Sequence, residues 1–571
     1  MLTLGLVYVN HDSAAALVHD GAIVAAAAEE RFNRHKHSAA FPRLALQSCL
    51  TQIGADLADI SEVGLFTNPW LYYKLAMCNL VSDLPRSFKY LPYPLQIARR
   101  EFALKRVLRD NVPFRFRKVR FVTHHQAHAG SAFYPSPFDS AAILTIDGRG
   151  EYETACIYAG SGNRIRQLYR LMYPHSIGYL YSTVTRFLGF EPFNDEYKVM
   201  GLSAYGTTRL VDQFKDVVGA DENGEFRLNL RYFDHSYTYG PKRRYFSDRF
   251  ISAFGPPRFG NDPVTQHHAD LAFALQRATE KAFLSLSRRA ASLVGSRCLC
   301  LAGGVALNCL AVAVVLESGL FDDVFVQPAS DDSGTAIGSA LVCQFSRNRA
   351  IARVRMKDVF LGPEITDDDV RRVADDYRDK FEISRPADLN HIAAKILNDG
   401  QILGWCQGRM EFGPRALGNR SILASAVDSG MKDRINASVK FREPFRPFAP
   451  VVLAERAETF FTLEGSGRFV YPFMVATAKA VHAQARSIPA VVHEDGTSRI
   501  QIVSDGDNSR LHALLRAYEE LSGLPVLLNT SFNVRSEPIV CTAEDAVRNA
   551  LMSDLKYVVI GETLFIKKNQ E

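Results

Sequence analysis

Three short segments near the start of the chain predict strands that are separated by tight turns. Residues 3–9, 14–18 and 22–26 are apolar and strand-like, and polar turn residues lie between them. Residues 141–146 predict another buried strand, which ends at Asp147 and leads through a turn into a further strand. A hairpin with a polar turn therefore occurs twice, which favours a two-lobed fold with internal pseudo-symmetry.

Length and composition narrow the class of protein. The 571 residues predict two to four domains, and 47% hydrophobic with 23% charged residues is typical of a globular protein. The sequence has no run of 18 apolar residues and its start lacks a basic leader, so we expect no membrane span. Nine cysteines without paired spacing are typical of a reducing compartment, so we expect a cytoplasmic protein.

A His124-His125-Gln126-Ala127-His128 motif indicates a metal site. On a helix, His124 and His128 share one face, where two imidazoles can hold one metal ion. Asp147, at the end of its strand, could complete the site. Such a pair is also common as two surface or core histidines, and both interpretations stay open on this motif alone. The zinc-peptidase HExxH pattern is absent, because no Glu follows His124.

The second half of the chain carries cationic residues in Gly- and Pro-rich surroundings. They are Arg409, Arg415, Arg420, Lys440, Arg442, Arg446 and Arg499. Forked guanidinium groups on rigid loops hold phosphate or carboxylate, which favours a highly charged ligand. The alternative is a set of ion pairs with Glu411, Glu443 and Asp495. No P-loop motif occurs.

Two further segments bear on the organisation of the chain. Residues 346–357 are polar and basic and predict a linker, so we divide the chain into domains at 1–350 and 351–571. Residues 86–120 contain 11 Lys or Arg against Glu101 and Asp110, with aromatic residues between them. That segment could bind nucleic acid, an anionic ligand or a membrane surface, or it could be a solvated helical face.

Several motifs together resemble the NodU/CmcH-type O-carbamoyltransferase family, over essentially the whole chain. They are HDSAA, AEERF, HHQAHA, DGRGE, LAGGVALN, DSGTAIG, GRMEFGPRALGNRS, FREPFRPFAP and LNTSFN. The resemblance implies an α/β protein with an N-terminal two-lobed actin-like domain and a C-terminal YrdC-like α/β domain. A strand-turn-strand-turn-strand opening is also how actin-like domains begin.

The resemblance also implies an activity. The second domain would join carbamoyl phosphate to ATP, giving carbamoyl adenylate and pyrophosphate, and the first would transfer the carbamoyl group to an acceptor hydroxyl. The acceptor would be a small molecule, such as a sugar or a natural product in antibiotic biosynthesis. The alternatives are a tRNA-modifying threonylcarbamoyl-type transferase and a non-catalytic nucleotide-binding regulator. We expect no nucleic-acid partner, and a homo-oligomer is compatible with the sequence.

Residue by residue, the resemblance implies three groups of site residues. The metal ligands would be His124, His128, Asp147 and Asp332, for Fe(II) or another divalent ion, although Asp331 directly precedes Asp332 and offers a second carboxylate. The catalytic residues would be His11, on the acceptor side, and Lys36, near the transferred group. ATP, with Mg²⁺, and carbamoyl phosphate would be bound by Gly303, Gly304, Asn308, Arg415, Lys440, Arg446, Arg499 and Ser531.

Overall fold

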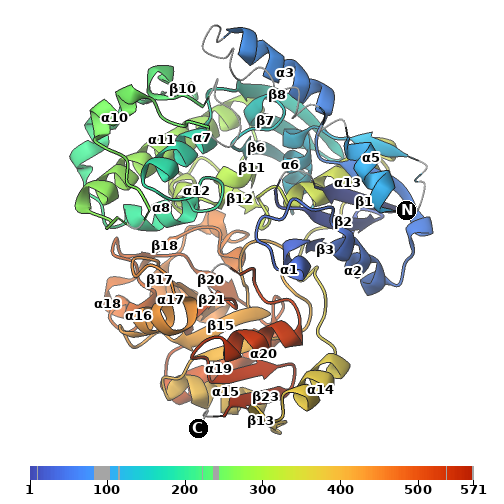
Figure 1. Cartoon of the computed structure of the whole chain (residues 1–571), viewed down its shortest axis with the longest axis vertical. Helices are drawn as coiled ribbons and strands as arrows, with labels where there is room; N and C mark the ends of the chain where they lie inside the picture. The colour runs from blue at the N-terminus through green and yellow to red at the C-terminus, as the bar shows by residue number, and fades with distance from the viewer. Residues whose placement is uncertain are drawn as a thin grey trace. The chain divides into compact units, whose positions relative to one another are not determined.

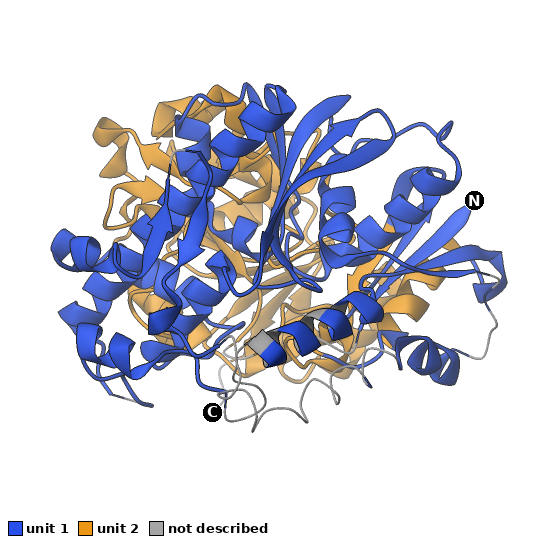
Figure 2. Ribbon diagram, turned by 90° about the horizontal axis from the view of Figure 1, so that it is seen from above, with its two compact units in different colours: residues 1–24, 39–43, 55–356 blue, residues 25–38, 44–54, 357–571 orange. Residues whose placement is uncertain are grey.

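The computed structural model describes residues 1–8, 11–82, 99, 103–112, 116, 118–221, 223–235, 243–260, 262–534 and 537–568. The chain forms two compact units (Figures 1 and 2). Unit 1 comprises residues 1–24, 39–43 and 55–356, and unit 2 comprises residues 25–38, 44–54 and 357–571. Most of the basic segment 86–120 lies outside the described residues.

Two five-stranded sheets of the same topology form unit 1, except that residues 25–28, the end of one edge strand, are assigned to unit 2. The first has the order β3-β2-β1-β4-β5 and the second the order β8-β7-β6-β11-β12. In each, an antiparallel hairpin partner lies on one side of the first strand and two parallel strands lie on the other. The bounds are β1 Leu2–Val7, β2 Ala14–His19, β3 Ala22–Ala28, β4 Ile60–Leu65, β5 Val119–Phe121, β6 Ser140–Ile146, β7 Glu153–Ser161, β8 Arg164–Met172, β11 Cys298–Ala302 and β12 Asp323–Val326. This duplication confirms the predicted α/β class and the two-lobed arrangement.

Two helices are exchanged between these sheets. Helix α6 (His124–Phe133) follows β5 of the first sheet but packs on β6, β7 and β11 of the second, whereas α13 (Gly334–Arg347) follows β12 and packs on β1, β2 and β4. The helices touch each other at Gly338, where a Cβ atom would lie 1.7 Å from the carbonyl oxygen of Ala127. Because only glycine permits this approach, the N-terminal ends of both helices meet at one place.

Helices and short strands complete unit 1. The long α11 extends over Gln266–Val294, close to the predicted 264–294, and Gln276 donates a hydrogen bond to Glu280 on one of its faces at 3.0 Å. The other elements are α3 Pro69–Ser82, α5 Leu104–Asn111, α7 Ile177–Phe187, α8 Glu196–Ser203, α9 Val211–Phe214, β9 Val218–Ala220, β10 Phe226–Leu228, α10 Asp248–Phe254 and α12 Cys309–Glu317.

An eight-stranded mixed sheet forms the centre of unit 2, in the order β13-β23-β22-β14-β15-β21-β16-β20. Helices α15 and α19 pack together over a core that contains the fully buried Trp405. The bounds are β13 Phe381–Ser384, β14 Leu403–Cys406, β15 Arg420–Ser425, β16 Ala449–Leu453, β20 Gln501–Val503, β21 Val526–Ser531, β22 Tyr557–Ile560, β23 Thr563–Lys567, α14 Asp367–Asp376, α15 Leu389–Asn398, α16 Met431–Ile435, α19 Ser509–Ser522 and α20 Ala543–Leu551; short strands β17 Phe461–Thr462, β18 Ala478–Ala480 and β19 Thr497–Ser498 form a separate sheet. The YrdC-like character of this unit stays a prediction.

The division of the chain differs from a single cut at residue 350. Part of the predicted linker belongs to unit 1, because Arg353 donates hydrogen bonds to the carbonyl oxygens of Phe133 and Phe138 at 2.5 and 2.7 Å. Residues 25–38 and 44–54 belong to unit 2. Arg34 holds the first of these segments there, because it donates to the carbonyl oxygens of Pro538 and Ile539, both at 2.8 Å. Among the described residues, no helix has the length and apolar character needed to cross a membrane.

Candidate functional site

Four predicted metal ligands converge in unit 1. His124 Nε2 and His128 Nε2, on the first turns of α6, lie 3.2 Å apart. Asp147 Oδ2, after β6, lies 3.4 and 2.9 Å from these nitrogens, and Asp332 Oδ1, before α13, lies 3.6 and 3.7 Å from them. One ligand atom from each residue lies within 4.8 Å of the other three. Asp331 is engaged elsewhere, because its carboxylate accepts hydrogen bonds from the backbone and side chain of Ser333.

The electrostatics of this cluster suit a cation. Burial by itself lowers the pKa of His128, but its hydrogen bonds to Asp147 and Asp332 raise that pKa to about 9. Burial tends to raise the pKa of Asp147, yet hydrogen bonds from His124 and His128 hold it well below its usual range. The proton held by His128 thus stabilises the carboxylates of Asp147 and Asp332, and a divalent ion could replace that proton. Two imidazoles and two carboxylates form a ligand set suited to Fe(II) and similar ions.

The glycines predicted for nucleotide binding lie directly beside this cluster. The Gly304 N–H donates to Asp147 Oδ2 at 3.2 Å, and the Gly148 N–H donates to Asp147 Oδ1 at 2.6 Å. Gly303 has φ +93° and packs so closely on β6 that a Cβ atom would lie 2.2 Å from the Ile146 carbonyl oxygen. Asn308 caps α12 and bonds to Gln276, so its side chain supports the fold locally.

Glu151 holds helix α6, which carries His124 and His128, in place, although the sequence assigned it no role. Both carboxylate oxygens accept from the His124 N–H at 3.1 Å, and one also accepts from the Asn68 N–H at 2.7 Å. The carboxylate therefore joins the N-terminus of α6 to the loop after β4. A negative charge at a helix N-terminus is favourable, because it complements the backbone N–H groups there. The DGRGE motif contained this residue but did not reveal its partner.

We expect Glu151→Ala to reduce the free energy of unfolding by about 1–3 kcal/mol, because buried N–H groups lose their acceptor. Metal affinity should fall as well, since His124 would lose its fixed position. Chemical denaturation and titration with Mn²⁺ would measure the two effects. Glu153→Gln is the matched control, because Glu153 is buried nearby but bonds to Gln167 instead. An unchanged Mn²⁺ affinity in folded Glu151→Ala would contradict this role.

His11 lies in the turn between β1 and β2 and faces the metal cluster. Its Nδ1 lies 2.7 Å from Asp12 Oδ2, and its Nε2 lies 3.7 Å from Asp332 Oδ2. Asp12 has φ +58°, an uncommon conformation that turns its carboxylate toward the ring. Burial lowers the pKa of His11, but Asp332 and Asp12 more than offset it and raise the pKa to about 10. Sequence reasoning found His11 but missed Asp12.

In unit 2, Lys440 is the centre of a second site. Its ammonium group donates to the Asn533 carbonyl and side-chain oxygens at 3.0 and 2.8 Å and also to the Ser531 carbonyl oxygen. Burial lowers the pKa of Lys440 well below its usual range, and the nearby charges of Arg442, Arg446 and Lys36 lower it further. Uncharged oxygens hold this lysine among three other cations, an arrangement that an anionic ligand would stabilise.

The other predicted residues of this site occupy separate loops of unit 2. Lys36 lies in unit 2 with Lys440, and not with His11 in unit 1, which differs from its assignment to the first domain. Arg415 lies on a loop whose backbone N–H groups converge on the buried Glu411. Arg499 follows β19, where its charge helps burial to lower the pKa of His493 to about 4. Glu411 therefore supports a backbone turn instead of pairing with arginine side chains.

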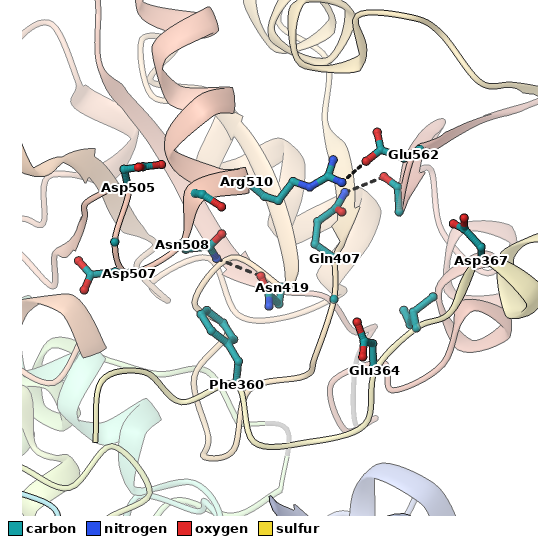
Figure 3. Close-up of a pocket in the computed structure, with 15 residues that line it drawn as sticks. Phe360, Glu364, Asp367, Gln407, Asn419, Asp505, Asp507, Asn508, Arg510 and Glu562 are labelled. Atoms are coloured by element: carbon teal, nitrogen blue, oxygen red, sulfur yellow. Dashed lines mark hydrogen bonds and ion pairs between the residues drawn. The ribbon is translucent and has the colours of Figure 1, made fainter. Parts of the chain in front are cut away.

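A pocket of about 480 Å³ in unit 2 has the opposite charge (Figure 3). Its lining includes the carboxylates of Glu364, Asp367, Asp505, Asp507 and Glu562. Arg510 reaches Glu562, and Asn508 donates to Asn419 at 3.0 Å. None of the predicted ligand residues lines this pocket, and its charge would repel phosphate groups. A phosphate group would therefore fit the surroundings of Lys440 better.

The described part of the basic segment consists mainly of α5. Leu104 and Leu108 are buried, whereas Lys105, Arg106 and Arg109 are exposed, which is the pattern of a solvated amphipathic helix. Farther along, Lys118 and Arg120 both lie 3.3 Å from the buried Glu62 carboxylate. These two cations stabilise a buried charge, so they are part of the folded structure of unit 1.

Fold and sites together define a two-unit α/β protein with a His₂Asp₂ cluster in one unit and a buried, cation-surrounded lysine in the other. Residues 2–341 match the family model described as Carbamoyltransferase N-terminus, and residues 394–567 match Carbamoyltransferase C-terminus. The chain therefore belongs to the carbamoyltransferase family, which makes it a transferase.

Relatives of this chain are similar over nearly its whole length. The nodulation protein NolNO of Sinorhizobium fredii is 39% identical over 98% of this chain and 79% of its own. The uncharacterized protein sll1178 of Synechocystis is 37% identical over 99% of this chain and 97% of its own. Among solved structures, an activator of 2-hydroxyisocaproyl-CoA dehydratase from Clostridium difficile aligns with 61% of this chain and 96% of its own, at 15% identity and a TM-score of 0.32.

Proposed function

We propose that this carbamoyltransferase works in two half-reactions. Unit 2 forms carbamoyl adenylate from carbamoyl phosphate and ATP, and unit 1 transfers the carbamoyl group to a hydroxyl of a small-molecule acceptor. The observation that carries the proposal is Lys440, buried and held by uncharged oxygens, with Arg442, Arg446 and Lys36 nearby. These cations suit two phosphate-bearing substrates, whose charges would otherwise repel each other.

In the first half-reaction, the cations of unit 2 bind and orient the substrates. Lys440 lies where its charge can stabilise the ATP phosphates, and Arg446 and Arg415 can hold phosphate oxygens through forked hydrogen bonds. Ser531 and Asn533 fix the lysine by accepting hydrogen bonds from its ammonium group. Carbamoyl phosphate and ATP, with one water consumed, would give carbamoyl adenylate, pyrophosphate and phosphate.

In the second half-reaction, His11 is the group placed to accept the proton of the acceptor hydroxyl. It can do so only as the neutral imidazole, which a divalent ion on Asp332 would favour, because the charge of Asp332 is the main cause that raises the pKa of His11. Asp12 orients its ring through Nδ1, which leaves Nε2 directed toward Asp332. A general base of this kind contributes typically about 100- to 10,000-fold to the rate. A divalent ion held by His124, His128, Asp147 and Asp332 would supply Lewis-acid polarisation beside the base. Gly304 keeps Asp147 in position through its N–H.

Isotope exchange between pyrophosphate and ATP tests the proposal with the full-length protein. We expect exchange that depends on carbamoyl phosphate, because carbamoyl adenylate forms reversibly. Exchange that is absent, or that proceeds equally without carbamoyl phosphate, would contradict the adenylate route. Incubation with candidate hydroxyl compounds should then give products that gain one carbamoyl group by mass, and that gain would identify the acceptor.

A further inference from the structure

Arg243 of unit 1 is a charged side chain held by uncharged groups. Its guanidinium group donates to the Tyr179 and Tyr173 hydroxyl oxygens at 3.1 and 3.3 Å and to the His235 carbonyl oxygen at 2.9 Å. It lies 4.7 Å from the centre of the Tyr179 ring and 5.3 Å from that of Tyr245. Its Nε is buried without a hydrogen-bond partner among the described residues.

No described residue supplies a carboxylate that would balance the charge of Arg243. Among the described residues, its hydrogen bonds reach only tyrosine hydroxyls and one carbonyl, and it forms no ion pair with a carboxylate. A guanidinium group that is largely removed from water without a counter-ion is costly, because neutral oxygens offset its lost hydration only in part. A bound anion would supply the missing charge.

This arginine lies close to the metal cluster through helix α7. Tyr179 is in the first turn of α7, and the capping residue Ser176 donates to the Gly148 carbonyl oxygen at 2.7 Å, next to Asp147. Tyr179 also packs edge-on against Phe193, which stacks on His11 with 6.2 Å between ring centres. Burial raises the pKa of Tyr179, but the charges of Arg243 and Arg149 outweigh it and lower that pKa.

Local structure holds Arg243 in this position. The neighbouring backbone forms a β-bridge between Phe233 and Phe246, and the Asp234 N–H donates to the Tyr245 carbonyl oxygen at 3.1 Å. Tyr179 stacks on His235 with 5.0 Å between ring centres. Arg243 is only partly exposed and Tyr179 and Tyr173 are buried, so an incoming group would meet a guanidinium that the two tyrosines hold in position.

We propose that Arg243, with the hydroxyls of Tyr179 and Tyr173, forms a binding site for a phosphate-type oxyanion beside the metal cluster of unit 1. The site rests on the proposed function, because it would hold the charged part of a substrate next to His11. Two sources share this chemistry. The anion is either the phosphate of the adenylate donor, which leaves as AMP, or a phosphate carried by the acceptor.

The test is equilibrium dialysis of the full-length protein with radiolabelled inorganic phosphate. We expect two classes of phosphate-binding site, one in each unit. Arg243→Gln should weaken one class about 10- to 100-fold, because charge-assisted hydrogen bonds are lost. Arg446→Gln should weaken only the other class. Arg243→Lys, which keeps the charge, should recover part of the lost affinity. A purely structural arginine would not produce this graded response.

Two further measurements separate the sources and provide the controls. If the donor phosphate is the ligand, Arg243→Gln should weaken AMP binding and leave adenosine binding unchanged; unchanged AMP binding assigns the phosphate to the acceptor. Arg249→Gln, which removes an exposed arginine that lies over Tyr232, should alter neither class. The proposal would be overturned if folded Arg243→Gln kept both classes of phosphate binding intact. If the glutamine variant does not fold, a phosphate affinity of Arg243→Lys equal to that of the wild type would overturn it.

Failure of this proposal can be distinguished from failure of the proposed function. Carbamoyl-phosphate-dependent pyrophosphate exchange should be unchanged in Arg243→Gln, because unit 2 is intact. Absence of that exchange in the wild-type protein would contradict the adenylate route, and it would leave the count of phosphate classes unaffected.

Discussion

Arg446→Ala should abolish carbamoyl-phosphate-dependent pyrophosphate exchange, whereas Asp332→Asn should leave exchange nearly unchanged and stop carbamoyl transfer. The reason is that the charged groups of the two half-reactions lie in different units. Arg446 lowers the pKa of Lys440 in unit 2, while Asp332 lies within 3.7 Å of His124 and His128 in unit 1. We expect a loss of about 100-fold or more in each affected half-reaction, since each variant removes charge stabilisation from its site. Arg415→Ala should behave like Arg446→Ala, and His128→Ala should behave like Asp332→Asn.

Two rates measured on the same preparations would test this separation, namely pyrophosphate exchange and formation of carbamoylated product. Arg378→Ala is the control for unit 2, because the side chain of this exposed arginine pairs, among the described residues, only with Asp375 at 2.8 Å and the backbone near it. His19→Ala is the control for unit 1, since His19 is exposed beside Asp20. If folded Asp332→Asn lost exchange as completely as Arg446→Ala, the assignment of one half-reaction to each unit would be wrong.

Anaerobically purified protein should contain one divalent metal ion per chain, and Asp332→Asn and His128→Ala should lose most of it. Four ligand atoms within 4.8 Å of one another form one site, and removal of one ligand typically weakens such a site severely. Elemental analysis would identify the metal, with Fe(II) expected. Active wild-type protein without any metal would remove this cluster from the mechanism.

The pH dependence of metal binding gives a second measure of the same site. Because the metal must displace the proton of His128, whose pKa is about 9, affinity should increase about tenfold per pH unit between pH 7 and 9. The proton also stabilises the metal-free protein. Its contribution to the free energy of unfolding is complete below about pH 6.5 and is lost as the pH rises through about 9. Mn²⁺ titrations at several pH values would check the first trend, and a flat profile would contradict it.

Local patterns in the sequence were sufficient to predict most of the architecture of unit 1. The apolar strands and their polar turns indicated the hairpins that contain His11 and Asp147, and the duplicated topology confirms the two lobes. The HxxxH spacing placed His124 and His128 on one helix face, as α6 shows. These features depend on neighbours along the chain, which a sequence displays directly.

Other features depend on contacts between distant residues. Glu151 meets the N-terminus of α6 and the loop after β4, and neither contact follows from local pattern. Residues 25–38 and Lys36 belong to unit 2 because Arg34 bonds to residues more than 500 positions away. The acidic pocket likewise combines segments near residues 364, 407, 505 and 562, and none of these segments indicates a pocket when it is read alone in the sequence.

The sequence by itself therefore determined the types of element and indicated the candidate site residues. The resemblance named Asp332 as a metal ligand, but the preceding Asp331 offered a second carboxylate. The tertiary structure decided between them, because Ser333 engages Asp331 while the exchanged helices α6 and α13 bring Asp332 to the histidines. Periodicity encodes which face a residue occupies, whereas the pairing of faces depends on packing across the fold. For the same reason, only the folded chain shows that Arg243 is held by uncharged oxygens.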